Sequence, residues 1–346
     1  MPFNGRKATA SPIVAANARK ESAVVRLGLA MGIAGGVICL AMGGGAWAEG
    51  GGESPKYELR YRFLPGETIR WNVVHRNQVK TMVAGAAKTV ETASRSVKVW
   101  RVLRVEADGA AVFEQAVEDI DMRHQMSGCD EVRYNSRTDK EPPPGFDDVA
   151  SAVGVPLATV TLDSRGRVIK REQKSSKAQA PAQGDITMPL PEHPVAVGET
   201  WSKPSEVTVT AKDGRLIRVK MEQRFTLEEV KTGVARIRMK TLVLTPIRDP
   251  AVEAQVVQFA ADGEVRFDID AGRVRSQRTD VDRHVVGFRG ETSSIRYVTC
   301  FEEELQTQAA RSAATAGAKA DRPRATAEQR AQPVVRVAEA AEPAAR

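Results

Sequence analysis

Strict alternation of apolar and polar residues is the sequence feature that most constrains how this chain can fold. In the stretch YELRYRF, which begins at residue 57, every second residue is aromatic or aliphatic and the residues between them are charged. A period of two residues is typical of a strand that buries one face and exposes the other. Further ranges with this alternation are 69–73, 96–105, 110–122, 157–163, 205–211, 215–230, 233–244, 263–270 and 293–305. Only 145–154 has a helical pattern, so the sequence predicts a mostly β, antiparallel fold with one short helix.

Short motifs recur in the same order in the two halves of the chain. Each half begins with Gly-Glu-Thr followed closely by Trp, at 66–68 and at 198–200. A glycine between two strand candidates comes next, Gly109 in the first half and Gly233 in the second. Each half then has a Gly-Arg-Val motif, at 166–168 and at 272–274. We predict that each Gly-Arg-Val motif is the tight turn of a β-hairpin, because glycine tolerates the positive φ that such turns require. The sequence thus indicates two pseudo-repeated halves, with a chance coincidence of short turn motifs as the alternative.

Composition and pattern divide the chain into six parts. They are a signal peptide at 1–48, a disordered linker at 49–56, a first β half at 57–172, a linker at 173–185, a second β half at 186–305 and a disordered tail at 306–346. The tail is rich in Ala, Arg and Pro and has almost no large apolar residue. It therefore cannot bury enough surface to offset the entropy lost on ordering.

The first 48 residues have the layout of an export signal. Five cations precede the 22 uncharged residues from Leu27 to Ala48, which end in Ala-Trp-Ala. This order predicts cleavage after Ala48. The alternative is an uncleaved anchor in the inner membrane formed by residues 27–48, since a stretch of this length can cross a bilayer. In both cases the folded part is expected to be exported, to the periplasm or beyond the cell.

Export sets the expected redox state of two cysteines. Cys129 and Cys300 remain once the N-terminal segment is set aside. In an oxidising compartment such a pair predicts one disulfide, worth on the order of 5 kcal/mol for a loop of this length. Two separate buried thiols are the alternative.

The net charge of +7 comes from the two ends of the chain. Residues 1–48 contribute +4 and residues 306–346 contribute +3, which leaves the part between them neutral. A nucleic-acid-binding surface needs an excess of basic residues on the folded part, so no nucleic-acid partner is expected.

The chain lacks the short motifs of common catalytic, cofactor-binding and metal sites. Its densest polar stretch runs from Glu114 to Glu131, and carboxylates on one strand face can bind a hard cation or form an acid–base pair. A solvated strand face, with Arg123 balancing Asp121, is the simpler interpretation and the one adopted here. We therefore expect no catalytic residue, no cofactor and no metal, and hence no enzyme.

The alternating apolar faces are the candidate binding residues. They are Tyr57, Leu59, Tyr61, Phe63, Trp71 and Phe267. Such a face can line a cavity for an apolar ligand, and ordinary core packing is the alternative. We therefore predict a binding module for a lipid or another apolar ligand. A structural or protein-interaction component of the cell envelope, whose tail contacts an envelope protein or polymer, is the alternative function.

Two longer motifs carry a resemblance to known proteins. YELRYRFLPGETIRW and MPLPEHPVAVGETW, with the two Gly-Arg-Val hairpins, resemble a family of secreted bacterial proteins of unknown function. Members share a Y-x-L-x-Y-x-F-x-P-G-E opening strand and an L-P-x-x-P-V-x-V-G-x-x-W motif, and the resemblance covers roughly residues 57–305. The pattern of long strands is also similar to the half-barrels of periplasmic lipoprotein carriers such as LolA and LppX. These likenesses imply an exported curved sheet or half-barrel and assign a role to no residue.

Overall fold

The computed structural model describes residues 54–174 and 187–307, and one large antiparallel sheet dominates them. The sheet has 12 strands in the order β7-β6-β4-β3-β2-β14-β13-β12-β11-β10-β9, with β5 paired to β4, and β1 and β8 form a separate ribbon. The strands are β1 (Lys56–Tyr57), β2 (Thr68–Val83), β3 (Ala86–Val105), β4 (Ala111–Met126), β5 (Val132–Asn135), β6 (Pro156–Leu162), β7 (Val168–Gln173), β8 (Val195–Ala196), β9 (Thr200–Thr210), β10 (Leu216–Lys231), β11 (Val234–Val243), β12 (Asp262–Asp268), β13 (Arg273–Val286) and β14 (Ser294–Leu305). The expectation of a mostly antiparallel β fold is confirmed.

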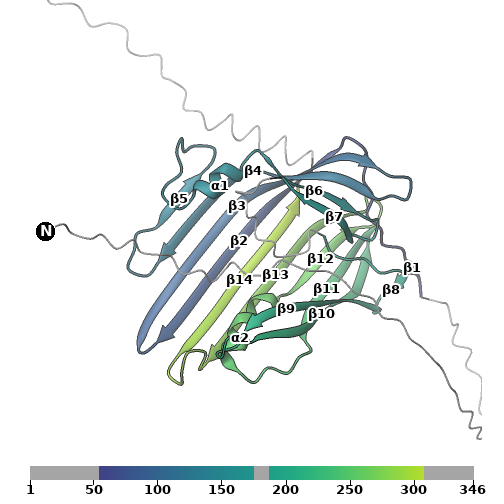
Figure 1. Cartoon of the computed structure of the whole chain (residues 1–346). Helices are drawn as coiled ribbons and strands as arrows, with labels where there is room; N and C mark the ends of the chain where they lie inside the picture. Colours follow the sequence, from purple (N-terminus) through teal and green to yellow (C-terminus); the bar gives the residue numbers. More distant parts are fainter. Residues whose placement is uncertain (1–53, 175–186, 308–346) are drawn as a thin grey trace, which may run out of the picture. The chain divides into compact units, whose positions relative to one another are not determined.

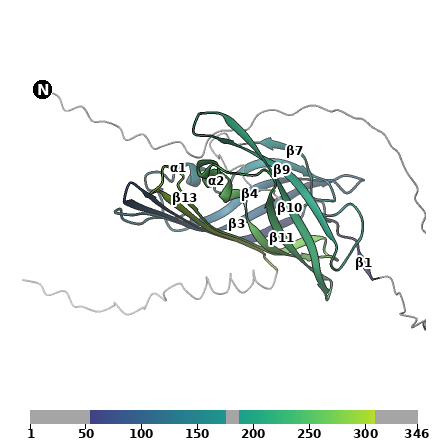
Figure 2. The same cartoon turned by 90° about the horizontal axis from the view of Figure 1, so that it is seen from below.

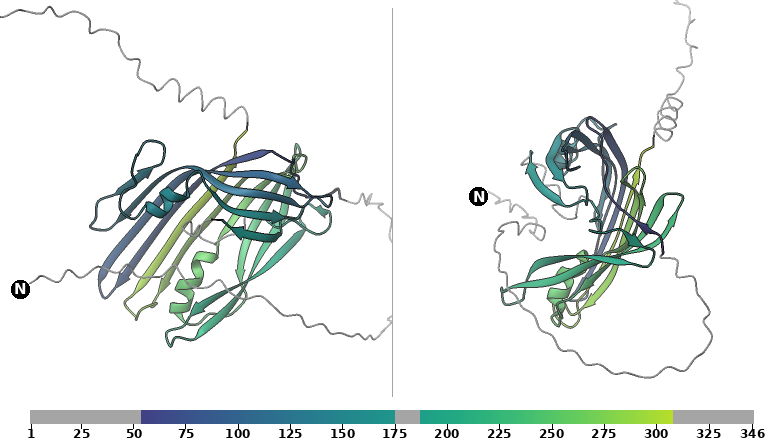
Figure 3. Two further views of the ribbon diagram at one scale, coloured as in Figure 1. Left: turned by 45° about the horizontal axis from the view of Figure 1, so that its top comes forward. Right: turned by 90° about the vertical axis from the view of Figure 1, so that its right-hand side faces the viewer.

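The sheet is open and curved. Figure 1 looks onto its concave side, with β2, β3, β14 and β13 in the centre. Figure 2 and the right-hand view of Figure 3 show that β9 and β10, at one edge, turn out of the plane of the central strands. The helices α1 (Asp147–Ala152) and α2 (Pro250–Val256) lie on the concave side near opposite margins, and the short 3-10 helix η1 (Val257–Phe259) follows α2.

The two halves repeat one plan. Strands β2, β3, β4, β6 and β7 form a meander, β9 to β13 form a second meander in the same order, and β14 joins the two between β2 and β13. A helix separates the third and fourth strands of each meander. Gly166 and Gly272 occupy the turns after β6 and β12 with φ of 81° and 62°, so the predicted Gly-Arg-Val hairpins are confirmed.

The second helix was absent from the sequence prediction. Asp249 caps α2, because its carboxylate accepts a hydrogen bond from the backbone amide of Ala251, and Pro250 occupies the first turn. An Asp-Pro pair is a standard start signal for a helix. The signal was therefore present in the sequence, within the short stretch between two strand candidates.

The opening segment, residues 58–63, is extended but is not a strand of the large sheet. Its alternation is as expected: Leu59, Tyr61 and Phe63 are buried, whereas Glu58 and Arg62 are exposed. The backbone amide of Tyr61 donates to Ser164 O at 2.8 Å and that of Arg62 donates to Gly272 O at 2.9 Å. The segment thus runs from the Gly-Arg-Val turn of one half to that of the other and ties them together.

An aromatic core lies under this segment. The ring centroids of Trp71 and Trp100 are 4.7 Å apart, and those of Trp100 and Phe113 are 4.3 Å apart. Tyr61 meets Phe267 edge to face at 5.4 Å. These rings and the aliphatic residues around them form the larger of two buried clusters, and the smaller one packs Val252 and Val256 of α2 against β9 and β10.

Several predicted segments fall wholly or mainly outside the described residues. They are the signal peptide with its cleavage after Ala48, the alternative anchor at 27–48, most of the linkers 49–56 and 173–185, and the tail at 306–346 except its first two residues. In the described part, no helix has both the length and the apolar character needed to cross a membrane.

Candidate functional site

The two faces of the central strands differ in charge. On the outer, convex face, charged side chains from neighbouring elements pair with one another. Examples are Arg70 with Glu118 at 2.8 Å, Arg133 with Asp121 at 2.7 Å and Arg296 with Asp282 at 2.7 Å. Exposed pairs of this kind contribute little stability, about 0 to 1 kcal/mol each, but they keep this face strongly hydrated.

The inner face of the same strands carries twelve uncharged residues in three rows, which we call the floor. Strand register defines each row across β4, β3, β2 and β14. The rows are Met122–Ser94–His75–Phe301, then His124–Thr92–Asn77–Thr299, then Met126–Val90–Val79–Tyr297. Residues opposite one another in a row lie about 5 Å apart, so each row presents a continuous surface.

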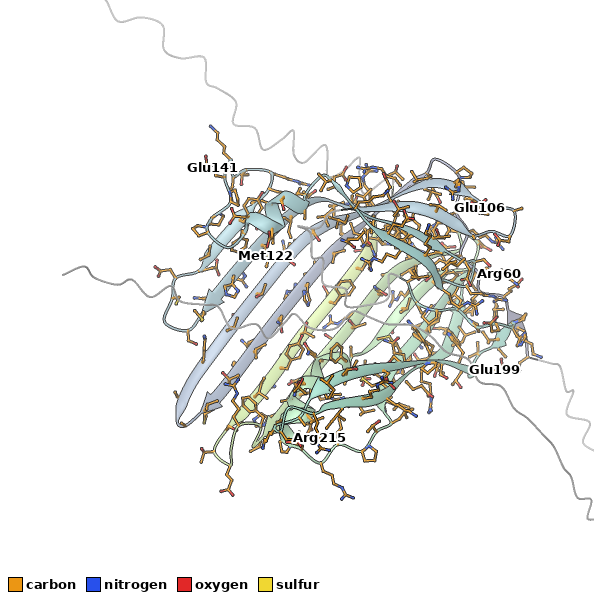
Figure 4. The ribbon with its side chains drawn as sticks, viewed as in Figure 1. Arg60, Glu106, Met122, Glu141, Glu199 and Arg215 are labelled. Atoms are coloured by element: carbon orange, nitrogen blue, oxygen red, sulfur yellow. The ribbon has the colours of Figure 1, made fainter. Side chains whose placement is uncertain are left out.

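The floor is incompletely covered by the rest of the protein. His75 is exposed and the other eleven residues are half-buried. Met122 marks its β4 side, close to α1, in Figure 4. An uncharged surface that stays partly open on the concave side of a sheet is a candidate site for an apolar ligand.

The middle row of the floor is polar. His124 Nδ1 and Thr92 Oγ1 are 3.2 Å apart, and His75 Nε2 of the neighbouring row lies 3.1 Å from Thr299 Oγ1. The Thr299 hydroxyl donates to Arg76 O at 3.0 Å, so His75 Nε2 is the donor to this hydroxyl. Asn77 lies between Thr92 and Thr299 in the row, and its Oδ1 is buried without a hydrogen-bond partner among the described residues.

Two titratable groups on the floor are held in their neutral forms. Protein atoms around the imidazole of His75 desolvate it and lower its pKa. Burial raises the pKa of the Tyr297 hydroxyl, and a hydrogen bond with Thr299 opposes part of that effect. Both shifts favour the uncharged species of these two groups at neutral pH.

A buried ion pair closes the end of the floor nearest the aromatic core. Lys98 of β3 and Glu303 of β14 form a salt bridge, and the Gln277 amide donates to Glu303 Oε2 at 2.9 Å. The Lys98 ammonium also lies 4.7 Å from the ring centroid of Trp71 and 5.0 Å from that of Trp100. The two charges are therefore compensated within the protein.

The predicted apolar residues lie in the packed core. Leu59, Tyr61, Phe63, Trp71 and Phe267 are all buried, and Tyr57 packs against the cluster from its margin. A cavity of about 20 Å³ remains beside them. That volume holds about one water molecule and no lipid. The structure thus brings these residues together, but what they surround is protein.

The floor was not among the candidates drawn from the sequence. Part of its pattern was visible, because Tyr297, Thr299 and Phe301 alternate within the predicted strand at 293–305. Their partial exposure depends on which strands pair beside β14, and pairing partners distant in sequence are not encoded in the pattern of one strand.

The acidic stretch from Glu114 to Glu131 forms no cluster of carboxylates. A β-bulge at Glu118 shifts the register between β3 and β4, so residues on its two sides change face relative to a regular strand. Glu118 pairs with Arg70, and Asp121 pairs with Arg133 instead of the expected Arg123. Throughout the described ranges, no group of acidic, His or Cys residues is placed to hold a metal ion.

The predicted disulfide is wrong, because Cys129 and Cys300 are both free thiols. Cys129 is exposed in the turn after β4, and Cys300 lies on β14 with β2 and β3 in between. Three strand spacings of about 4.8 Å separate the two positions by roughly 14 Å. Disulfide-bonded residues have Cα atoms less than about 7 Å apart, so no local adjustment joins them.

Comparisons with known proteins give no family. No protein-family model matches the chain, and no curated protein matches it. The resemblance to secreted bacterial proteins of unknown function is therefore not supported by a family match.

Two solved structures share features of the chain trace. A structure described as lipid–protein interactions in lipovitellin is 11% identical over 71% of this chain and 26% of that chain, with a TM-score of 0.40. DynF from the dynemicin biosynthesis pathway of Micromonospora chersina is 8% identical over 76% of this chain and 92% of that chain, with a TM-score of 0.19. The chain therefore spans about a quarter of the lipovitellin chain. Both TM-scores are too low to assign a fold family or a ligand.

Proposed function

We propose that this protein is a non-catalytic binding module that holds an apolar chain, such as the acyl chain of a lipid, on the floor. The observation that carries the proposal is the contrast between the two faces of the same strands. The outer face carries paired charges, whereas the twelve residues of the three inner rows on β4, β3, β2 and β14 are uncharged and remain partly open. The nearest charge in register with these rows is the exposed Arg283 of β13, opposite Tyr297.

The energetics favour an apolar occupant over water. Each 100 Å² of apolar surface that a ligand covers contributes about 2.5 kcal/mol, and a flexible chain can follow the curvature of the sheet. The Met122 and Met126 side chains at the β4 margin are unbranched and polarizable, so they can adapt to ligands of different shape. Retention in the periplasm or outside the cell, as the N-terminal sequence predicts, would give such a module access to envelope lipids.

A charge placed on the floor tests the proposal. Val79→Glu puts a carboxylate in the third row, whereas Val74→Glu puts the same group on the outer face of the same strand, opposite Arg95. Binding of a fluorescent fatty acid to the full chain should be saturable, should weaken tenfold or more in Val79→Glu and should persist in Val74→Glu. Absence of saturable binding to the wild-type protein, or equal loss in both variants, would contradict the proposal.

A structural or interaction role in the envelope is the second candidate, and the edge strand β7 supports it. All six residues of β7 are exposed, including the apolar Val168 and Ile169, and β7 ends the sheet. A strand edge of this kind can pair with a strand of another chain. Cross-linking of intact cells through a photoreactive residue at Ile169 would capture such a partner, and its absence would remove this candidate.

A further inference from the structure

We propose that the end of the sheet formed by the β2–β3 hairpin and the β13–β14 turn docks on an anionic lipid bilayer. This inference goes beyond the proposed function and does not depend on what the floor binds. It starts from the hairpin turn. The six residues from Met82 to Ala87 have no charged, hydroxyl or amide side chain, and all of them except Val83 are exposed.

The other hairpin turns of the sheet differ from this one. Within residues 54–174 and 187–307, each of them has at least one polar or charged side chain. Examples are Asp108 after β3, Arg165 after β6, Asp213 after β9 and Asp270 after β12. Asp, Asn, Ser and Gly are the usual residues of such turns, so an apolar turn is not needed to close a hairpin. An exposed apolar turn is suited to a surface that leaves water.

The apolar surface continues from the hairpin onto the neighbouring strands. Strand register places Val286, Ser294, Met82 and Ala87 side by side in one row across β13, β14, β2 and β3. Val286 is 57% exposed and Met82 is 46% exposed. The β2–β3 hairpin and the β13–β14 turn lie next to each other at the lower left of Figure 1. We call this row, together with the hairpin turn, the apolar margin.

Basic residues lie directly behind the apolar margin. The next row on the outer face is His284–Arg296–Lys80–Thr89, two residues or roughly 7 Å further along each strand. Lys88, on β3, lies between the two rows in sequence. Arg296 is paired with Asp282, whereas Lys80 and Lys88 have no ion pair among the described residues. An open hollow of about 640 Å³ is lined by both lysines and by the Arg296–Asp282 pair.

Positive charge is in excess at this end of the sheet. Residues 80–88 and 282–296 together carry five cations, Lys80, Lys88, Arg283, Arg289 and Arg296, and two carboxylates, Asp282 and Glu291. The neighbouring turn after β4 adds Asp130 and Glu131, of which Glu131 pairs with Arg123. A bilayer that contains anionic lipids attracts such a cluster, and each Lys or Arg near its surface contributes about fivefold in affinity.

The shape of the apolar margin favours a bilayer over a protein partner. A stable protein interface uses about 20 to 30 residues on each side, whereas the margin is one row and one turn. Interfacial segments bury their apolar side by roughly 5 to 10 Å and keep their cations among the lipid headgroups. The spacing of the apolar and basic rows matches this depth.

The test reads the depth of the margin in a bilayer directly. A fluorescent non-natural residue replaces Ala87 in the full chain, and the vesicles carry bromine, a short-range quencher, on their acyl chains. We expect quenching by vesicles of phosphatidylcholine mixed with phosphatidylglycerol, and much less by phosphatidylcholine alone. Leu103 is the matched control position, because it is 50% exposed and lies towards the opposite end of the same strand. The same fluorophore at position 103 should not be quenched.

Reversing the two lysine charges tests the basic row. Lys80→Glu combined with Lys88→Glu should weaken binding to the anionic vesicles about tenfold or more, as measured by lipid titration of the signal at position 87. Added salt should weaken the binding of the unaltered protein as well. Arg95→Glu, at an exposed position in the middle of β3, should preserve the binding.

Each contrary outcome has a definite meaning. The proposal is overturned if position 87 is not quenched, or if positions 87 and 103 are quenched equally, because the margin then does not enter the bilayer. Equal quenching by neutral and anionic vesicles, or unchanged binding after the lysine reversal, would overturn the role of the basic row. Fatty-acid binding to the floor is measured without vesicles, so the failure of one proposal leaves the other standing.

Discussion

Gly166 lies so close to Tyr61 that a Cβ atom at position 166 would be 2.5 Å from Cε2 of the tyrosine ring. The same relationship recurs in the second half, where a Cβ at Gly272 would be 2.6 Å from Cβ of Arg62. The glycines of the two Gly-Arg-Val turns thus contact consecutive residues of the opening segment. The motif recurs because the opening segment crosses the ends of both hairpins, and only a glycine in each turn leaves room for it.

Replacing Gly166 should therefore lower the free energy of unfolding by more than backbone strain at a positive φ alone would. Gly166→Ala adds a methyl group at a positive φ and against the Tyr61 ring, so we expect a loss of roughly 2 to 4 kcal/mol in the free energy of unfolding. Gly214 is the matched control, because its φ of 83° is similar and nothing lies within 4 Å of the position that a Cβ would take there. Gly214→Ala should cost only about 1 kcal/mol. Urea titrations of both variants measure the difference, and equal losses would show that Tyr61 contributes nothing.

Lys98 and Glu303 should stabilise the sheet mainly because each of the two buried charges neutralises the other. Lys98→Met leaves a carboxylate that is only 4% exposed without its cation, so we expect a loss of about 3 kcal/mol. Adding Glu303→Gln removes the uncompensated charge and should restore part of that loss. A double-mutant cycle from denaturant unfolding supplies the coupling energy. Strict additivity of the two single changes would mean that the pair does not interact in solution.

The local features of this fold could be predicted from the sequence. Alternation located many of the strands, and the Gly-Arg-Val motifs located two hairpins, because a two-residue period and a positive φ are properties of short segments. The predicted ranges missed β13 (Arg273–Val286), most of β2 and the first half of β3. The opening segment shows the limit of such patterns. Its alternation requires only that one side be buried, and an extended segment meets that requirement whether or not it pairs with a neighbouring strand.

The candidate site depended on features that no single segment encodes. β14 is the last strand of the sheet in sequence order, yet it pairs with β2 near the beginning, and that pairing creates the floor and separates Cys300 from Cys129. The bulge at Glu118 likewise reassigns the carboxylates of β4 to partners that regular alternation does not give. Strand order and register over long sequence separations therefore account for the predictions that failed.

Acid should destabilise the protein through His75. Its pKa is lowered in the folded state by desolvation, so the unfolded chain binds the proton more tightly. Stability is therefore complete above the ordinary pKa of histidine, about 6.5, and falls as the pH decreases through the folded-state value. His75→Asn should reduce this acid-dependent loss, whereas His284→Asn, on β13, should retain it. Melting temperatures measured from neutral to mildly acidic pH test this, and parallel curves for the wild type and His75→Asn would contradict it.

In protein that lacks residues 1–48, and therefore Cys39, the thiols of Cys129 and Cys300 should react with a disulfide reagent at very different rates. Burial, together with a hydrogen bond and charge repulsion from Asp280, raises the pKa of the Cys300 thiol to about 11, whereas Cys129 is exposed in its turn. Because the thiolate is the reactive species, Cys129 should be modified first and Cys300 much more slowly at mildly alkaline pH. Cys129→Ser should abolish the fast phase of colour release and Cys300→Ser the slow one, while in denaturant the two thiols should react at similar rates. If neither cysteine reacts in the native protein until a reductant is added, Cys129 and Cys300 form a disulfide. Their positions about three strand spacings apart would then be incorrect.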